Sequence, residues 1–480
     1  MTAGPGRAMV ATGHPLAAGA AAAVLREGGS AVDAAIAADA VMGVVEPMAT
    51  GVGGDLLAML VPQQGAPQAY NGSGRAPLSL DPAQVAALPG ERIPERHPLS
   101  VTTPGAVRGW HDLHARHGRL PWRRLLREAI DVAAAGFPVA PVAAREWAWF
   151  EPVLRAQPEC AALYRAGAAP RAGETFRNPE LAAVLEAIAT DGPDAFYRGV
   201  PAQAAERAVR ALGGVLSAED FAAHRGEFVA PVAGSFRGLQ VLQCPPNTHG
   251  VAVLHALAAL EPLALAPEDP LTMVAAVQAM KQAQDFAART VADPAGNTVC
   301  TVVVDADGFA VTLMSSIFKR FGAGIVAPGC GFVLQNRGFG FSRPGHRNGP
   351  TPGKRPYHTV VPGAALREGR LHAAFGVVGG AMQPQGQVQL LLRIAAWNQG
   401  PQPAIDAPRW RLEGGRELAI ETGMPQATRQ ALRAAGYTEP ARGELGGRSD
   451  FGGAQLVLRT PDGGLAGGSD RRKDGLVLVI

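Results

Sequence analysis

Hydrophobic and polar positions in the first part of the chain separate a helical region from a strand region. From His14 to Val45 the sequence is rich in alanine and glycine at helical spacing, and Gly28–Gly29 interrupts the pattern, which predicts two closely packed helices. Residues 51–61, GVGGDLLAMLV, turn into a continuous apolar run that predicts a strand, and a second strand precedes the turn-forming segment NGSGRAP at 71–77. We therefore expect helices packed against a sheet near the N-terminus.

The rest of the chain continues this succession of helices and strands. Residues 104–168 have a largely helical pattern, and 271–289 gives the clearest single helix. Two strands are expected between Thr298 and Ser316, a third at 371–378, a helix at 386–398, and a final strand after RRKDG. Runs of strand separated by runs of helix predict an α+β fold with layers around one continuous core.

One hairpin near the middle of the chain brings two hydroxyl groups together. The run VCTVVV after Thr298 does not alternate with polar residues, so both faces of this strand should be covered. The segment DADGF at 305–309 predicts a tight turn in which Gly308 adopts the left-handed conformation. If Asp305 and Phe309 close this loop, Thr298 lies opposite Ser316, unless a bulge shifts the register by one. An ordinary cross-strand hydrogen bond and a catalytic pair are both compatible with this spacing.

Composition excludes several classes of protein. With 480 residues, 47% hydrophobic and 18% charged, the chain is expected to be globular, and its length alone would allow about three domains. A net charge of +3 without a basic stripe argues against a nucleic-acid partner or a membrane partner. Four widely separated cysteines predict no disulfide framework, and no leader or spanning segment stands out, so we expect a cytoplasmic location.

No pattern in the sequence predicts a cofactor or a metal. The glycine-rich segment GAGIVA at 322–327 is followed by Pro328 rather than by a helix, so it is a weak match to a dinucleotide-binding loop. His111, His114 and His117 are spaced by three residues on an expected helix, so the outer two do not share one face well. We therefore predict a small-molecule site without a cofactor.

Several motifs, in order along the whole chain, resemble the gamma-glutamyltransferase family of N-terminal-nucleophile hydrolases. The segments that carry the resemblance are GHPLAAGAAAAVLREGGSAVDAAIAADAVMGVVEP, GNTVCTVVVDADG, FGAGIVAPGCGFVLQNRG, PGKRPYHTVVPG, FGVVGGAMQPQG and GGSDRRKDG. The resemblance implies a four-layer αββα sandwich that cuts its own chain between Asn297 and Thr298. It implies a large segment, 1–297, and a small one, 298–480, which remain associated as one intertwined unit, and it is compatible with a homodimer.

The resemblance also implies roles for the residues around the new N-terminus. Thr298 falls at the position of the nucleophile, and its own α-amine, with an ordinary pKa of about 8, would act as the base. Ser316 matches the second hydroxyl of the family, which is the residue that the hairpin spacing also reaches. Gly379 and Gly380 match the glycine pair whose backbone N–H groups form the oxyanion hole.

The substrate positions depart from the family pattern. Family members that act on γ-glutamyl groups hold the substrate's α-carboxylate at positions that correspond here to Ser73, His358 and Thr359, and its α-ammonium with an acid where this chain has Gly340. Because the segment NRGFGFS at 336–342 contains no acid, an ammonium would be buried without a partner. Arginines and a histidine could instead bind an anion; the candidates are Arg75, Arg337, Arg355 and His358.

These departures predict an amidohydrolase for a small carboxylate-bearing amide, of the oxamate, glutaryl or succinyl type. In this respect the sequence is more similar to the oxamate-amidohydrolase-like branch than to glutathione-cleaving members. Two alternatives stay open: an enzyme that acts on glutathione-like γ-glutamyl substrates, and an uncleaved binding protein of the same fold. The second remains open because only the short segment TVADPAGN, 290–297, links the preceding helix to Thr298.

Overall fold

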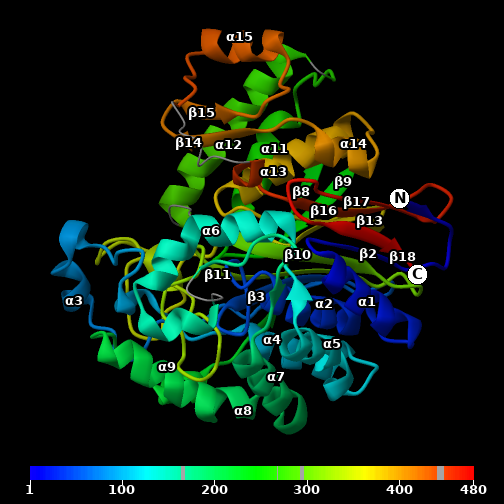
Figure 1. Ribbon diagram of the computed structural model, residues 1–480. Coiled ribbons are helices and arrows are strands. Elements are labelled where there is room, and N and C mark those ends of the chain that lie inside the picture. The colour runs from blue at the N-terminus through cyan, green and yellow to red at the C-terminus, as the bar shows by residue number, and fades with distance from the viewer. Residues whose placement is uncertain (164–167, 268, 292–296, 441–447) are drawn as a thin grey trace.

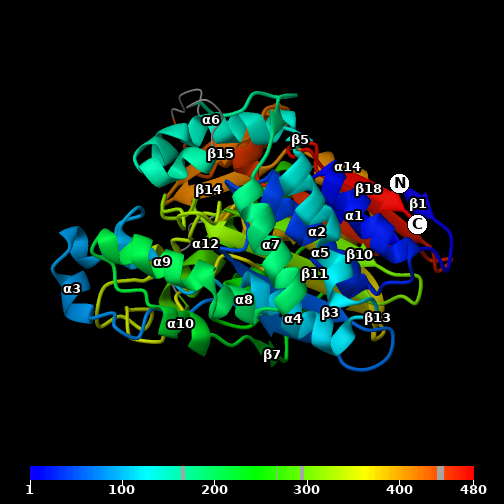
Figure 2. The same ribbon diagram turned by 60° about the horizontal axis from the view of Figure 1, so that its bottom comes forward.

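Two stacked antiparallel sheets form the centre of the protein, and helices cover both outer faces (Figures 1 and 2). The computed structural model describes residues 1–163, 168–267, 269–291, 297–440 and 448–480. The four layers confirm the predicted αββα sandwich. No helix in these ranges combines the length and the apolar composition that crossing a membrane requires.

Each of the two sheets has seven strands, and each takes strands from both sides of Thr298. The sheet that carries Thr298 runs in the order β18 (Leu476–Val479), β2 (Met9–Thr12), β10 (Asn297–Val304), β11 (Ala310–Phe318), β3 (Asp55–Val61), β4 (Gln68–Asn71) and β7 (Glu227–Val229). The other sheet runs in the order β1 (Thr2–Ala3), β17 (Leu465–Ser469), β16 (Ala454–Arg459), β13 (Arg370–Val377), β12 (Gly363–Arg367), β9 (Leu239–Gln243) and β8 (Val232–Phe236). The segments before and after Thr298 are therefore interleaved in both sheets.

The helices divide between the two outer faces. The sheet that contains β10 is covered by helices of the first half of the chain: α1 (Pro15–Arg26), α2 (Ala31–Val45), α4 (Ala106–His117), α5 (Trp122–Ala135), α6 (Pro141–Arg155), α7 (Pro179–Asp191), α8 (Asp194–Tyr197), α9 (Val200–Ala211) and α10 (Ala218–Ala223). The other sheet is covered by α11 (Gly250–Leu260), α12 (Pro270–Thr290), α13 (Met382–Leu391), α14 (Pro401–Asp406) and α15 (Gln426–Ala434). Three shorter elements lie at the periphery: α3 (Pro82–Ala86) and the strand pairs β5 (Phe137–Pro138)–β6 (Thr175–Phe176) and β14 (Trp410–Gly414)–β15 (Glu417–Ile420).

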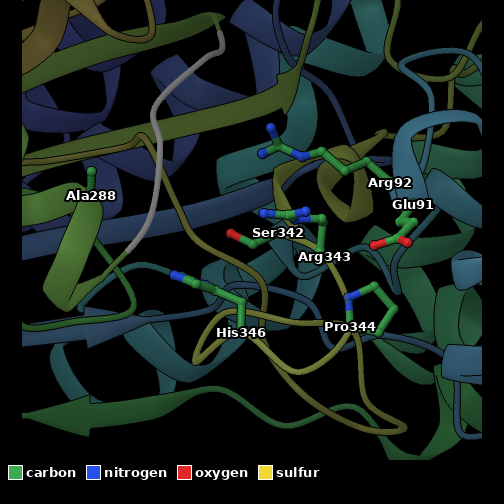
Figure 3. Close-up of a pocket in the computed structure, with 7 residues that line it drawn as sticks. All are labelled: Glu91, Arg92, Ala288, Ser342, Arg343, Pro344 and His346. Atoms are coloured by element: carbon green, nitrogen blue, oxygen red, sulfur yellow. The ribbon is translucent and has the colours of Figure 1, made fainter.

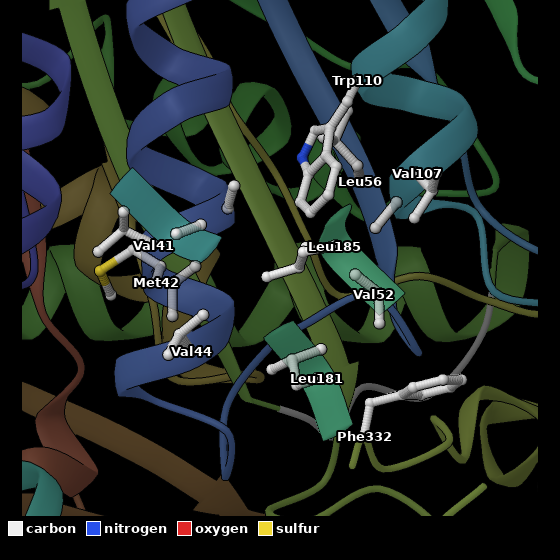
Figure 4. Packing of buried hydrophobic residues seen from close by; sticks show 14 of the residues in the cluster. Val41, Met42, Val44, Val52, Leu56, Val107, Trp110, Leu181, Leu185 and Phe332 are labelled. Carbon is white, nitrogen blue, oxygen red and sulfur yellow. The ribbon is translucent and has the colours of Figure 1, made fainter. Parts of the chain in front are cut away.

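The hydrophobic interior is divided into zones, which corrects the expectation of one continuous core. One large cluster lies between the first-half helices and their sheet, a second lies between the two sheets, and a third lies under α11–α14. Figure 4 shows part of the first, where Val41 and Met42 of α2, Leu56 of β3 and Trp110 of α4 are packed. Four layers create three interfaces, and the two sheets separate the zones.

The predicted elements agree well with the observed ones. The two alanine-rich helices are α1 and α2, separated at Gly28–Gly29, and every residue of α2 is buried. Ser30 and Asp33 form a reciprocal capping box that fixes the start of α2. The helix expected at 386–398 instead begins at Met382 and gives way to a π-helical turn, Leu392–Ala396, so its first turn lies directly after Gly379–Gly380.

The hairpin of β10 and β11 has the predicted loop. The Asp305 N–H donates to the Phe309 carbonyl across 3.0 Å, and Gly308 has a φ of 84°. The predicted register is confirmed from Val304–Ala310 to Val299–Ser315. Between Val299 and Asn297 the ladder shifts by one residue, so the strand pairing does not place Thr298 directly opposite Ser316. The irregularity therefore falls at the residue expected to be the nucleophile.

Candidate active site

Thr298 is buried at the start of β10, and its hydroxyl is held by a glutamine from the other sheet's helix layer. The Oγ1 atom accepts a hydrogen bond from Gln383 Nε2 across 2.6 Å. The other end of the same amide, Oε1, accepts from the Val361 N–H across 3.0 Å. Because both ends of the amide are engaged, Gln383 fixes the side-chain position of Thr298.

Gly379 and Gly380 lie between β13 and α13, just before the helix that carries Gln383. Their φ values are 109° and 60°, and their carbonyls accept from the N–H groups of Met382 and Gln383 at 3.1 and 3.0 Å. A Cβ atom on Gly379 would stand 2.9 Å from Gly452 Cα, so the site requires glycine for both conformation and space. The pair is thus placed at the N-terminus of a helix, where backbone dipoles favour negative charge.

Ser316 lies on β11 and is fully buried. Its Oγ accepts from the Phe318 N–H across 2.8 Å and from Arg337 Nη2 across 3.1 Å. The guanidinium of Arg337 stacks 4.2 Å above the Phe318 ring. The hydroxyl that the hairpin spacing singles out is therefore in contact with a buried cation.

Arg337 belongs to a buried charged cluster. Its Nη1 donates to Thr359 Oγ1 across 3.2 Å, and its Nε lies 3.7 Å from Asp55 Oδ2. Burial lowers the pKa of Arg337 to about 10, so it remains a cation at neutral pH. On the other side of Asp55 Oδ2, His358 Nε2 lies 3.1 Å away. The structure thus brings Arg337, His358 and Thr359 together around one carboxylate.

Both carboxylate oxygens of Asp55 already accept hydrogen bonds from the protein. The Oδ1 atom accepts from the Gly74 N–H and from Gln335 Nε2, each across 2.8 Å. Burial by itself would raise the pKa of Asp55, but the hydrogen bond from His358 and the positive charge of Arg337 leave that pKa below its usual value. The carboxylate is therefore ionised and has donors on both oxygens.

His358 is neutral in this cluster. Burial lowers its pKa to about 4, and the nearby Arg337 charge acts in the same direction. Its Nδ1 accepts from the Val360 N–H across 3.2 Å, which leaves the proton on Nε2, facing Asp55. His358 consequently serves as a hydrogen-bond donor to Asp55 and contributes no positive charge at neutral pH.

Three other predicted substrate positions, Ser73, Arg75 and Arg355, have partners outside the Asp55 cluster. Ser73 is buried and its Oγ donates to Asn71 Oδ1 across 2.6 Å, while its carbonyl accepts from Arg355 Nε across 2.8 Å. Arg75 and Arg355 both pair with Glu227, at 2.8 and 2.9 Å. Of the four predicted anion-binding residues, these two arginines share one carboxylate of the protein itself, which offsets part of their charge.

Gly340 occupies the end of a short 3₁₀ turn, Arg337–Gly340. A Cβ at this position would stand 3.1 Å from the Tyr357 carbonyl, so the space beside the glycine is limited. Asn348 Nδ2 donates to the Gly340 carbonyl across 2.7 Å. The turn presents no carboxylate to a substrate, in agreement with its sequence.

Sequence reasoning missed two residues of this site, Gln383 and Asp55. Gln383 follows the Gly379–Gly380 pair in the motif MQPQG, and a polar residue in the first turn of a buried helix is a usable signal. Asp55 stands as the only charged residue at the start of the apolar strand DLLAMLV. An isolated carboxylate in such a strand is expected to have specific partners, and this expectation would have identified it.

Two cavities open beside the end of α12. The larger, about 420 Å³, is shown in Figure 3 and is lined by Glu91, Arg92, Ala288, Ser342, Arg343, Pro344 and His346. The smaller, about 230 Å³, includes Ala381, next to Gly379–Gly380, and shares Ala288 with the first. The predicted tether before Thr298 starts at this point, and its residues 292–296, including Gly296, lie outside the described residues.

Two stacked antiparallel sheets between helical layers, with a buried threonine at the start of a central strand, define the class of N-terminal-nucleophile hydrolases. A family model described as Gamma-glutamyltranspeptidase matches residues 17–301 and 293–480. The chain therefore belongs to the gamma-glutamyltranspeptidase family and is an amidohydrolase or acyltransferase of that class.

Individual relatives cover nearly the whole chain. An oxamate amidohydrolase proenzyme from Klebsiella pneumoniae is 34% identical over 97% of this chain and 97% of its own length. The Glutathione hydrolase-like YwrD proenzyme from Bacillus subtilis is 32% identical over 98% of each chain. Among solved structures, a cephalosporin acylase from Bacillus halodurans superimposes with a TM-score of 0.92 at 34% identity, covering 100% of this chain and 96% of that one.

Proposed function

We propose that this chain matures by cutting itself between Asn297 and Thr298, and that Thr298 then hydrolyses a small carboxylate-bearing amide through an acyl-enzyme. The observation that carries the proposal is the 2.6 Å hydrogen bond from Gln383 to Thr298 Oγ1, made from the helix turn that directly follows Gly379–Gly380. This contact holds a hydroxyl beside backbone groups suited to a developing oxyanion.

Maturation would follow from proximity. The Thr298 hydroxyl oxygen bonds to the Asn297 carbonyl carbon as the peptide C–N bond breaks, which gives an ester and frees the α-amine of Thr298. Water then hydrolyses the ester and leaves segments 1–297 and 298–480. The shift of register in β10 between Asn297 and Val299 supports this step, because a regular strand would hold the peptide away from the hydroxyl. Because both sheets contain strands from each segment, the two pieces would stay together.

Turnover uses the same groups. The free α-amine of Thr298 accepts the hydroxyl proton as the oxygen adds to the substrate carbonyl, and the N–H groups of Gly379 and Gly380 stabilise the oxyanion. The amine returns the proton to the leaving nitrogen, and water releases the acyl group in the second half-reaction. Ser316, with Arg337 on its oxygen, supports the position of the nucleophile.

The charge distribution supports a substrate without an α-amino group. The carboxylate nearest to Arg337 is Asp55, whose two oxygens already accept from Gly74, Gln335 and His358. A substrate ammonium would therefore find no available acid among these described residues and would be costly to bury. The 420 Å³ cavity, by contrast, is lined by two arginines, Arg92 and Arg343, and one acid, Glu91, so positive charge predominates there.

Oxamate and glutaryl amides fit this description, and the name of the oxamate amidohydrolase relative agrees with the first of them. The YwrD relative, named glutathione hydrolase-like, supports the competing γ-glutamyl substrate. The two differ by one α-ammonium group, and the engaged state of Asp55 favours the substrate that lacks it.

Two measurements test the proposal. Intact mass of purified protein should show fragments 1–297 and 298–480, and Thr298→Ala should remain a single chain. Cut protein should then hydrolyse oxamate or a glutaryl anilide more efficiently, by kcat/KM, than γ-glutamyl-p-nitroanilide. An uncut wild-type chain would contradict the maturation step, and efficient turnover of the γ-glutamyl substrate alone would contradict the substrate class.

A further inference from the structure

A third, very small cavity adjoins Thr298, and its lining contains none of the predicted substrate positions. Its volume is about 10 Å³, and its lining includes Thr298, Glu46, Gln455 and Lys473. Glu46 follows the last residue of α2, Gln455 lies on β16 of the other sheet, and Lys473 lies in the turn before β18. Side chains from three layers thus surround a space with room for about one small polar group.

Two of these side chains are buried acceptors. Glu46 is 4% exposed, and no hydrogen bond to its carboxylate is found within the described ranges. Its Oε1 lies 3.7 Å from where a Cβ on Gly13 would stand, so the carboxylate rests against the backbone. Gln455 is 2% exposed, and its Oε1 has no hydrogen-bond partner in the part of the chain that the structure describes. Buried acceptors without donors are costly, so this cavity suits a group that carries several N–H donors.

The surrounding charges leave Glu46 in need of a cation. Lys473 Nζ donates to Glu146 Oε1 across 2.9 Å, and Arg320 also pairs with Glu146. Asp474 accepts from the N–H groups of Val142 and Ala143. The two cations are thus engaged by Glu146. Burial raises the pKa of Glu46 to about 7; the charges of Lys473 and Arg320 oppose this shift, and those of Glu146 and Asp474 add to it.

We infer that this cavity receives the α-amino group of Thr298 after cleavage, and that Glu46 and Gln455 bind its ammonium form and so set the pH at which it becomes a base. The inference rests on the proposed function, because the amine exists only if the chain is cut at this residue. An ammonium supplies three donors to two acceptors and places a positive charge beside the carboxylate. Glu46 is a positioning residue in this scheme, since it acts on the substrate only through the amine.

The test is the pH dependence of kcat/KM for cut protein, measured with whichever amide the wild type hydrolyses. An adjacent carboxylate favours the ammonium, so Glu46→Gln should lower the pKa of the amine. The acidic limb of the profile should then shift to lower pH by about one unit. Gln455→Leu, which keeps the charge and removes one acceptor, should move it in the same direction by less. Glu46→Asp, which keeps the charge, should restore the limb toward the wild-type position.

The matched control is Asp39→Asn, which removes a buried carboxylate within α2 that does not line this cavity. Its acidic limb should move less than that of Glu46→Gln. Unchanged limbs for both Glu46→Gln and Gln455→Leu in cut, active protein would overturn the inference and leave the proposed function intact. If Glu46→Gln does not yield soluble protein, the Gln455→Leu profile decides alone. A wild-type chain that is never cut would instead refute the proposed function.

Discussion

The amide of Gln383 reaches the hydroxyl of Thr298 from a different layer of the molecule, with 2.6 Å between Nε2 and Oγ1. Gln383 belongs to the first turn of α13, and Thr298 to the start of β10 in the opposite sheet. The contact therefore aligns the helix N-terminus, and the glycine pair before it, with one hydroxyl. Positioning of this kind across a packed interface is what a preorganised acyl-transfer site requires.

Replacing Gln383 with alanine should slow turnover without preventing folding. The substitution removes the donor that fixes Thr298 Oγ1 and leaves the Val361 N–H without its acceptor. Loss of one positioned donor typically costs on the order of a hundredfold in kcat, to be measured on cut protein. The control is Gln389→Ala on the same helix, whose amide donates to the carbonyls of Gln385 and Trp410. Equal losses for both variants would show that the helix, not the contact, matters.

Gly379→Ala should impair turnover because the added methyl group meets backbone. The residue has a φ of 109°, and the Cβ would stand 2.9 Å from Gly452 Cα. Strain of about 1–3 kcal/mol is expected, together with displacement of the N–H groups from the oxyanion position. We expect at least a roughly tenfold fall in kcat. Gly213→Ala, at a φ of 84° with nothing within 4 Å, supplies the same conformational strain far from the site and should leave kcat unchanged.

Arg337→Met should destabilise the protein far more than Arg355→Met. Arg337 is fully buried, and its removal leaves Asp55 with only neutral donors, which we expect to lower the free energy of unfolding by about 3–5 kcal/mol. Arg355 pairs with Glu227, whose side chain is 47% exposed, and donates to the Ser73 and Arg225 carbonyls, so its loss should cost about 1–2 kcal/mol. Urea unfolding of the two variants in parallel measures the difference, and similar midpoints would contradict the buried cluster's structural role.

Because of Asp39, the free energy of unfolding should fall as the pH rises from about 4 to about 6. Burial raises the pKa of Asp39 to about 6, while hydrogen bonds from Ser315 and Trp110 oppose this effect. Because the folded pKa lies above the unfolded value near 4, its contribution is fully present below pH 4 and is lost as pH rises through about 6. Asp39→Asn should therefore flatten the unfolding free energy between these pH values by about 3 kcal/mol. A variant with the wild-type slope would assign the titration to another group.

The sequence contains most of the information on local structure. Apolar periodicity located α1, α2, α12 and the hairpin, because these elements are long and strongly patterned. The hairpin register followed from the turn residues alone as far as Val299–Ser315. It failed at Thr298 itself, because a bulge depends on neighbouring strands and not on the turn.

The candidate site was accessible only in part. Ordered motifs indicated Thr298, Ser316 and the glycine pair, and they also showed that the position of Gly340 lacks an acid. Spacing could not show that Arg75 and Arg355 both pair with Glu227. That outcome depends on a strand more than a hundred residues away in the chain, and local patterns contain no information on such contacts.

The sequence by itself determined which segments form helices and strands, where the hairpin turns, and which hydroxyl stands at the start of a covered strand. The tertiary structure alone decided that Asp55, Arg337 and His358 share one buried cluster, that Gln383 holds Thr298, and that Glu46 and Gln455 adjoin it. Local elements follow from periodicity and turn chemistry between near neighbours. The partners of a buried polar group are set by the packing of distant layers, where an unpaired charge or donor is too costly to remain alone.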